Sequence, residues 1–89
     1  MDDYLAHILV VDDDDGIRSL VKRYLNENNY LVTTANSAED AVIKTSIIEF
    51  DLIILDIMMP GKNGLEFIQE NKKKISAPII LLTAKGEAN

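Results

Sequence analysis

The sequence lacks several residue types that often indicate a particular architecture. It contains no cysteine, no tryptophan, two prolines and four glycines in 89 residues. The absence of cysteine excludes a disulfide framework, a thiolate metal site and a cysteine nucleophile. With 47% hydrophobic and 27% charged residues, the composition is typical of a packed globular chain rather than a disordered one. It predicts a single domain over residues 1–89, because a chain of this length has room for one small core.

Positive charge and long apolar runs are also scarce. Nine Lys and Arg residues face fifteen Asp and Glu residues, which gives a formal net charge of −6. This surplus disfavours binding to nucleic-acid phosphates or to anionic lipid. The longest apolar runs, such as residues 79–82, are too short to cross a bilayer, and the acidic N-terminus is unlike a signal peptide. We therefore expect a cytoplasmic protein with no direct nucleic-acid or membrane partner.

The chain contains four short apolar runs, which predict β-strands. They lie at residues 7–11, 30–35, 51–56 and 79–82, and they are rich in residues that favour a pleated surface. The third run is apolar on both faces and is therefore expected at the centre of its sheet. Strict alternation of strands with helices predicts parallel pairing through right-handed crossovers. The expected fold class is an open α/β sheet covered on both faces.

The segments between these strands show helical spacing of apolar residues. The first predicted helix has Asp14 or Asp15 as its N-cap and ends at the Asn pair 28–29. The second follows Ser37, with Asp40 as a weak capping-box partner, and runs to about Glu49. The third covers residues 65 to about 73, after a loop at 58–64 that is rich in turn-forming residues.

Carboxylates stand where the first and third predicted strands end. Asp12 and Asp13 follow the first strand, and Asp56 ends the third. Because ligands of open parallel sheets bind beyond the carboxyl ends of the strands, neighbouring strands would bring these three side chains together. A cluster of oxygen ligands without thiol or imidazole favours a hard cation, namely Mg²⁺ with Mn²⁺ as a substitute. Without metal, like-charge repulsion is expected to raise the pKa of at least one of these carboxyls.

Asp56 is the better candidate for a nucleophile. It is single and ends a central strand, whereas Asp12 and Asp13 are adjacent and suit metal binding. A carboxylate beside Mg²⁺ can attack a phosphoryl group and form an aspartyl phosphate. Thr83 ends the fourth predicted strand, where its hydroxyl would reach a phosphoryl oxygen. The simpler alternatives are a solvated acidic helix start for residues 12–15 and a turn aspartate for Asp56.

Three motifs resemble the successive signatures of response regulator receiver domains. They read ILVVDDD at residues 8–14, LDIMMPGKNG at 55–64 and PIILLTA at 78–84. The resemblance covers essentially the whole chain and implies a flavodoxin-like doubly wound parallel sheet. It further implies an incomplete (βα)3β arrangement with strand order 2-1-3-4. By this resemblance the chain is the N-terminal portion of an OmpR-like regulator, truncated after the fourth strand, without its fifth strand, last helices and output domain.

The same resemblance implies a role in two-component signal transduction. Asp56 would accept a phosphoryl group from a phosphohistidine on a sensor histidine kinase. Asp13 and Asp56 would bind Mg²⁺ through their side chains, Met58 through its backbone carbonyl, and Asp12 mainly through water. Thr83 would be the switch hydroxyl. The chain would be a phosphoacceptor rather than an enzyme, assisting at most its own phosphorylation and dephosphorylation.

The C-terminal residues depart from the receiver pattern and leave a rival function open. Receivers carry a lysine and an aromatic residue on a fifth strand, and Lys85 lies too close to Thr83 to take the place of that lysine. The rival is a magnesium-binding, self-associating module that cannot complete the phosphorylation switch. Residues 79–82 would form an exposed apolar edge strand, which is a template for pairing with another chain. Self-association through this strand, or exchange of elements between protomers, is therefore expected.

Two other functions fit the residues poorly. An aspartate-nucleophile phosphatase resembles a pattern with a second aspartate two residues after the nucleophile, and this chain has Met58 there. A flavin-binding protein needs a phosphate cradle after the first strand. Here the four aspartates at residues 12–15 would repel the phosphate.

Overall fold

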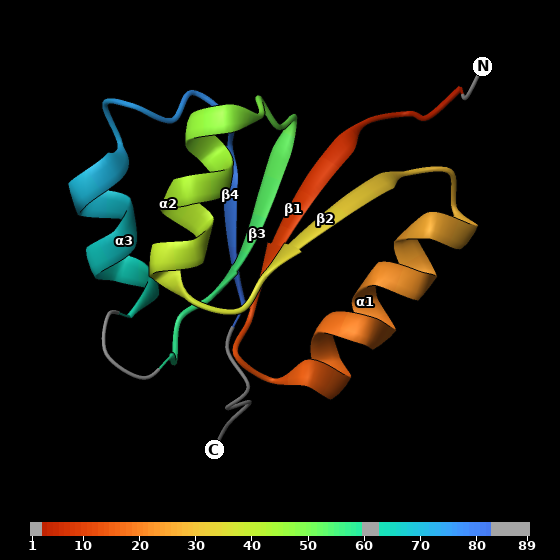
Figure 1. Cartoon of the computed structure of the whole chain (residues 1–89), viewed down its shortest axis with the longest axis horizontal. Coiled ribbons are helices and arrows are strands. Elements are labelled where there is room, and N and C mark those ends of the chain that lie inside the picture. Colours follow the sequence, from red (N-terminus) through yellow and green to blue (C-terminus); the bar gives the residue numbers. More distant parts are fainter. Residues whose placement is uncertain (1–2, 60–62, 83–89) are drawn as a thin grey trace.

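The computed structural model describes residues 3–59 and 63–82. Its four strands form one parallel sheet in the order β2-β1-β3-β4, with the helices packed on its two faces (Figure 1). The predicted alternation of strands and helices and the predicted flavodoxin-like strand order are both confirmed. The elements are β1 (His7–Val11), α1 (Asp15–Glu27), β2 (Leu31–Ala35), α2 (Ala38–Ile47), β3 (Leu52–Asp56), α3 (Gly64–Asn71) and β4 (Ile79–Leu82).

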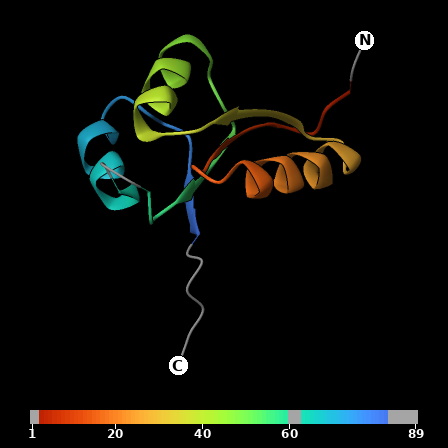
Figure 2. The same cartoon turned by 60° about the horizontal axis from the view of Figure 1, so that its bottom comes forward.

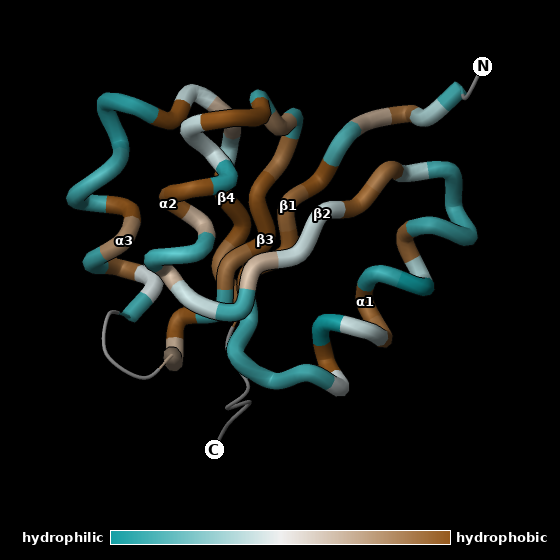
Figure 3. Tube along the Cα trace, in the orientation of Figure 1, coloured by the Kyte–Doolittle hydropathy of each residue, from teal (hydrophilic) through white to brown (hydrophobic). Residues whose placement is uncertain are grey.

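The sheet separates two apolar clusters, because successive side chains of a strand point to opposite faces. Figure 2 shows α1 on one face of the sheet and α2 with α3 on the other. The cluster under α2 and α3 is the larger and surrounds Phe67, which is fully buried. The cluster under α1 is built on Ile8, Val10 and Val32. In Figure 3 the strands β1, β3 and β4 are brown along most of their length, as expected for strands with two apolar faces.

Helix α1 leaves part of its face of the sheet uncovered. None of its residues is buried, and it packs mainly over β2 and β1. Ile54 pairs with Ile80 of β4, and partners in a parallel register share a face. Ile80 and Leu82 are 48% and 40% exposed. Within the described residues β4 is an edge strand of the sheet, and these two apolar residues of β4 are exposed.

Each helix starts at a polar cap that accepts a backbone N–H. Asp14 caps α1 and Ser37 caps α2, by accepting from the N–H groups of Ile17 and Asp40 at 3.0 Å. The predicted capping box at Ser37 is incomplete. The Asp40 carboxylate instead accepts from the N–H of Asn36, the residue before the cap, at 3.3 Å.

Helix α2 ends earlier than predicted. It stops at Ile47 rather than near Glu49, because Ile48 is extended and packs, together with Phe50, against the larger core. Core burial thus overrides the helical spacing of the sequence. The second strand likewise begins at Leu31, because the N–H of Tyr30 donates to the Leu25 carbonyl at the end of α1.

Helix α3 lies one to two residues closer to the N-terminus than predicted. It begins at Gly64 rather than Leu65 and ends at Asn71 rather than near Lys73. Asn63 and Glu66 form a complete capping box, which sets the start. At the end, the backbone N–H groups of Lys74 and Ile75 both donate to the Asn71 carbonyl. The third strand also begins one residue later than predicted, at Leu52.

In residues 3–59 and 63–82, no helix has the length and apolar content that a membrane span requires.

Candidate metal centre

The strand order brings the carboxylates of two separate motifs to one edge of the sheet. Strands β1 and β3 are neighbours, and Val11 pairs with Leu55. Asp12 follows the first of these residues and Asp56 the second, so both stand at the carboxyl ends of adjacent parallel strands. The sequence predicted this convergence on the condition that the two strands are neighbours, and the structure meets the condition.

Asp12, Asp13 and Asp56 form a cluster with the geometry of a small cation site. One carboxylate oxygen from each residue can be chosen so that all three atoms lie within 4.8 Å of one another. Asp12 and Asp56 are 6% and 9% exposed, whereas Asp13 is exposed. Three negative charges this close repel one another, and two of them have lost most of their hydration. The arrangement therefore favours a positively charged ligand.

Local hydrogen bonds orient the two buried carboxylates. Oδ1 of Asp12 accepts from the backbone N–H of Asp14 at 2.9 Å, and Oδ1 of Asp56 accepts from that of Met58 at 3.1 Å. Each bond closes a tight turn directly after a strand. The carboxylates are thus held at the sheet edge by the loops that leave it.

Gly64 allows α3 to begin directly against the end of β3. Its N–H donates to the Ile57 carbonyl at 3.0 Å. A Cβ atom at this position would lie 2.9 Å from the backbone oxygen of Asp56 and 3.0 Å from the Cα of Ile57. In the sequence this glycine is recognisable only as a turn former. Its tertiary role is to permit a close backbone approach behind the Asp56 carboxylate.

Arg18 also contacts the loop after β1, and the sequence did not indicate this. Its guanidinium donates to the backbone carbonyl of Asp12 at 2.8 Å and forms an ion pair with Asp15. Arginine on a polar helix is usually read as solvated. The helical spacing of residues in the sequence does not indicate that the Arg18 side chain folds back toward the N-terminal end of α1.

The residues present fit a magnesium ion. Mg²⁺ prefers oxygen ligands in a compact octahedral arrangement and is commonly held by one or two carboxylates with water. The cluster offers carboxylate oxygens from two strand ends, and Asp13 is open to solvent, so water has access. Among the described residues the cluster contains no thiolate or imidazole, which would favour a softer metal.

A comparison with known protein families identifies the family of this chain. Residues 8–89 match the family model described as the response regulator receiver domain. The chain belongs to the receiver-domain family. Similar curated proteins include Protein PetR of Rhodobacter capsulatus, 47% identical over 81 residues, and Transcriptional regulatory protein ResD of Bacillus subtilis, 46% identical over 80 residues. These matches cover 91% and 90% of this chain but 34% and 33% of the relatives, so this chain spans about a third of their length.

Solved structures of receiver domains share this fold. The response regulator TrrA of Thermotoga maritima, in complex with Mg(2+)-BeF, has a TM-score of 0.84 and 49% identity, covering 92% of this chain and 72% of that one. TrrA in complex with the histidine kinase ThkA has a TM-score of 0.84 and 46% identity, covering 96% and 74%. A receiver domain with this fold is therefore known both with magnesium and with a histidine kinase.

Some predicted site residues are not placed by the structure. Thr83, the predicted switch hydroxyl, lies outside the described residues. Met58 is 60% exposed, and its N–H donates to Oδ1 of Asp56. Its backbone carbonyl as a metal ligand stays a prediction.

Burial raises the pKa of Asp12 above its ordinary value of 3.8, and the charges of Asp56, Asp13 and Asp14 add to the rise. The N–H bond from Asp14 opposes it. A raised carboxyl pKa was predicted from repulsion. Repulsion contributes, but burial of Asp12 is the larger cause.

The raised pKa of Asp12 makes the metal-free protein less stable as this residue ionises. The folded state holds the Asp12 proton more tightly than the unfolded chain does, so protonated Asp12 stabilises the fold. This stabilisation is fully present below pH 3.8 and is lost as the pH rises through the raised pKa. We predict that the urea midpoint of the metal-free parent falls across this window relative to that of Asp12→Asn. Parallel midpoint profiles for the two proteins would contradict the prediction.

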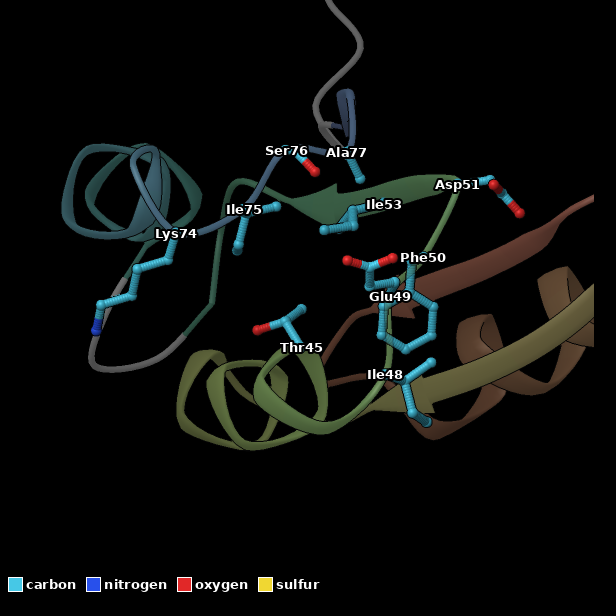
Figure 4. A pocket seen from close by; sticks show the side chains of 10 residues that line it. All are labelled: Thr45, Ile48, Glu49, Phe50, Asp51, Ile53, Lys74, Ile75, Ser76 and Ala77. Carbon is cyan, nitrogen blue, oxygen red and sulfur yellow. The ribbon is translucent and has the colours of Figure 1, made fainter.

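A pocket lies at the end of the sheet opposite the carboxylate cluster and does not join that cluster. It encloses about 240 Å³ between the end of α2 and the loop before β4, below the roughly 300–1,000 Å³ of ordinary small-molecule sites. Figure 4 shows the carboxylate of Glu49 facing into it, whereas the Lys74 side chain extends away. Its walls include Ile53 near the start of β3, so it is remote from Asp56 at the end of that strand.

Proposed function

We propose that this chain accepts a phosphoryl group on Asp56 from a sensor histidine kinase, in a reaction that depends on Mg²⁺. The observation that carries the proposal is the convergence of Asp12, Asp13 and Asp56 at neighbouring strand ends. Membership of the receiver-domain family supports it. So does the magnesium complex of TrrA, whose receiver domain is 49% identical to this one.

The proposed step transfers phosphorus from nitrogen to oxygen. A carboxylate oxygen of Asp56 attacks the phosphorus of a phosphohistidine, a P–O bond forms, and the P–N bond breaks with its electron pair leaving on the imidazole. Asp56 suits this role because its carboxylate is fixed by the Met58 N–H at the end of a central strand. Thr83 is proposed as the switch hydroxyl that hydrogen-bonds the phosphoryl group.

Asp12, Asp13 and Asp56 are the side chains that would hold the metal, with the backbone carbonyl of Met58 as a further ligand. Mg²⁺ in this place would neutralise negative charge on the transferring group. Mn²⁺ is proposed as a substitute, because it also accepts oxygen ligands. Asp12, which is the most buried of the three, would act mainly through water.

The proposed partner is a histidine kinase, as in the complex of TrrA with ThkA. The chain would act as a phosphoacceptor and not as an enzyme on other substrates, assisting at most its own phosphorylation and dephosphorylation. We propose a cytoplasmic location and no direct contact of this segment with nucleic acid, in keeping with its net charge of −6.

Phosphoryl uptake is the direct test of the proposal. After incubation of the chain with a small-molecule phosphodonor and Mg²⁺, we expect intact mass spectrometry to show the gain of one phosphoryl group. Removal of the metal by a chelator should abolish the gain. No gain in a sample that circular dichroism shows to be folded would overturn the proposal for this chain and favour the rival function, a magnesium-binding module without the switch.

We further propose self-association through β4 or by exchange of elements between protomers. Ile80 and Leu82 belong to the edge strand β4 and are 48% and 40% exposed, and such an edge offers free backbone groups for pairing. Light scattering is expected to show a molecular mass that rises with concentration. Leu82→Lys, which places a charge on the strand edge, should shift the chain toward monomer. A constant monomer mass for the parent at high concentration would refute this proposal.

A further inference from the structure

Arg18 links the first turn of α1 back to the end of β1. Its Nη1 donates to the backbone carbonyl of Asp12 at 2.8 Å, and its Nη2 pairs with the carboxylate of Asp15. The side chain is only 18% exposed although it belongs to a helix with no buried residue. A guanidinium donates in a fixed planar fork, so two acceptors at once restrict its position strongly.

The loop that Arg18 contacts carries two of the three carboxylates. Asp12 is anchored at its N–H, which donates to the Ala35 carbonyl at 3.1 Å, and its Oδ1 accepts from the Asp14 N–H at 2.9 Å. Without Arg18, the carbonyl of Asp12 would lose the hydrogen bond that the guanidinium donates to it. The peptide between Asp12 and Asp13 would then be free to rotate, and this peptide sets the direction of both side chains.

We infer that Arg18 is a positioning residue that holds the loop 12–14 in the conformation in which Asp12 and Asp13 converge with Asp56. The inference rests on the proposed magnesium site, and it adds a residue that touches neither metal nor phosphoryl group. Arg18 acts through the Asp12 carbonyl, in the manner of outer-shell partners whose loss typically weakens metal binding about 10-fold to 100-fold.

The positive charge of Arg18 and its role in positioning the loop have opposite effects on Mg²⁺ affinity. The direction in which the affinity changes when Arg18 is replaced therefore distinguishes them. A positive side chain beside a cation site repels the cation. If charge alone mattered, removing Arg18 would strengthen Mg²⁺ binding. If Arg18 positions the loop, its removal weakens Mg²⁺ binding despite the relief of repulsion.

The experiment compares Arg18→Met with Arg23→Met in the full chain. Both replacements remove one positive charge from α1 and keep a long side chain of good helix propensity, and Arg23 is exposed. Isothermal calorimetry measures Mg²⁺ affinity, and urea unfolding shows that each variant is folded. We expect Arg18→Met to bind Mg²⁺ about 10-fold more weakly than the parent, and Arg23→Met to bind as the parent does or slightly more tightly. Arg18→Lys, which keeps one donor and the charge, should recover part of the loss.

A second measurement needs no metal and separates the two proposals. Hydrogen exchange of the Asp14 amide reports directly on the bond to Asp12. In metal-free Arg18→Met we expect this amide to exchange faster than in the parent, relative to the amide of Leu9 in β1, and in Arg23→Met to exchange as in the parent. If the parent binds no Mg²⁺ but the Asp14 amide responds, the magnesium site fails and the positioning role stands. Equal or tighter Mg²⁺ binding by Arg18→Met, or unchanged Asp14 exchange, overturns the inference.

Discussion

Asp56→Asn is expected to take up no phosphoryl group under conditions in which the parent chain gains one. Asparagine has almost the same shape as aspartate, and its side-chain oxygen can still accept from the Met58 N–H. The fold should therefore be retained. The amide, however, lacks the nucleophilic carboxylate that an aspartyl phosphate requires, and the substitution removes one of the three carboxylates of the cluster.

Asp51→Asn is the matched control for Asp56→Asn. Asp51 precedes the same strand, at the opposite end of the sheet, and its carboxylate accepts from the His7 N–H at 2.8 Å. The two variants lose the same charge and one carboxylate each. Intact mass after incubation with phosphodonor and Mg²⁺ should show a gain for Asp51→Asn only. A gain of mass by Asp56→Asn would show that another residue accepts the phosphoryl group.

Gly64→Ala is expected to destabilise the fold and slow phosphoryl uptake together. The new Cβ would lie 2.9 Å from the Asp56 backbone oxygen and 3.0 Å from the Ile57 Cα. Both of these atoms belong to backbone, so relief requires that α3 or the end of β3 shift. Forcing extra volume into a packed site typically costs about 1–3 kcal/mol. A shift of the β3 end also displaces the Asp56 carboxylate from the cluster.

Gly16→Ala provides the control for Gly64→Ala. Gly16 also lies in the first turn of a helix, and its added Cβ would approach only the side-chain Oδ1 of Asp14, at 3.2 Å. A side chain can move by a few tenths of an ångström, and alanine in a helix is favoured over glycine by about 0.5–1 kcal/mol. Urea unfolding should therefore show a loss for Gly64→Ala and little change or a gain for Gly16→Ala. Equal stability of the two variants would count against the close approach at Gly64.

The strands were easier to predict than the helix ends. Residues 7–11 and 79–82 form strands with the predicted bounds, because an apolar β-branched run has few alternatives in a small domain. Helix ends depend on which side chain reaches the core. Ile48 leaves α2 to pack on the core below it, and nothing in the helical spacing distinguishes this residue from the one before it.

The candidate site was likewise only partly predictable from the sequence. Carboxylates directly after buried strands are conspicuous in one dimension, so Asp12, Asp13 and Asp56 could be named and their convergence expected. Arg18 and Gly64 could not be given their roles. Each acts through a backbone atom of another segment, and a sequence does not show which backbone atom lies near a given side chain.

The sequence by itself determined the alternation of strands and helices, the central place of β3 and the acidic residues at the strand ends. Hydrophobic periodicity is local, so residues close in the chain suffice to set it. Only the tertiary structure decided how β1 lies against β3, how deeply Asp12 is buried, and that Arg18 folds back to its carbonyl. These features depend on distances between segments far apart in the chain, and packing of the whole sheet and its helices sets those distances.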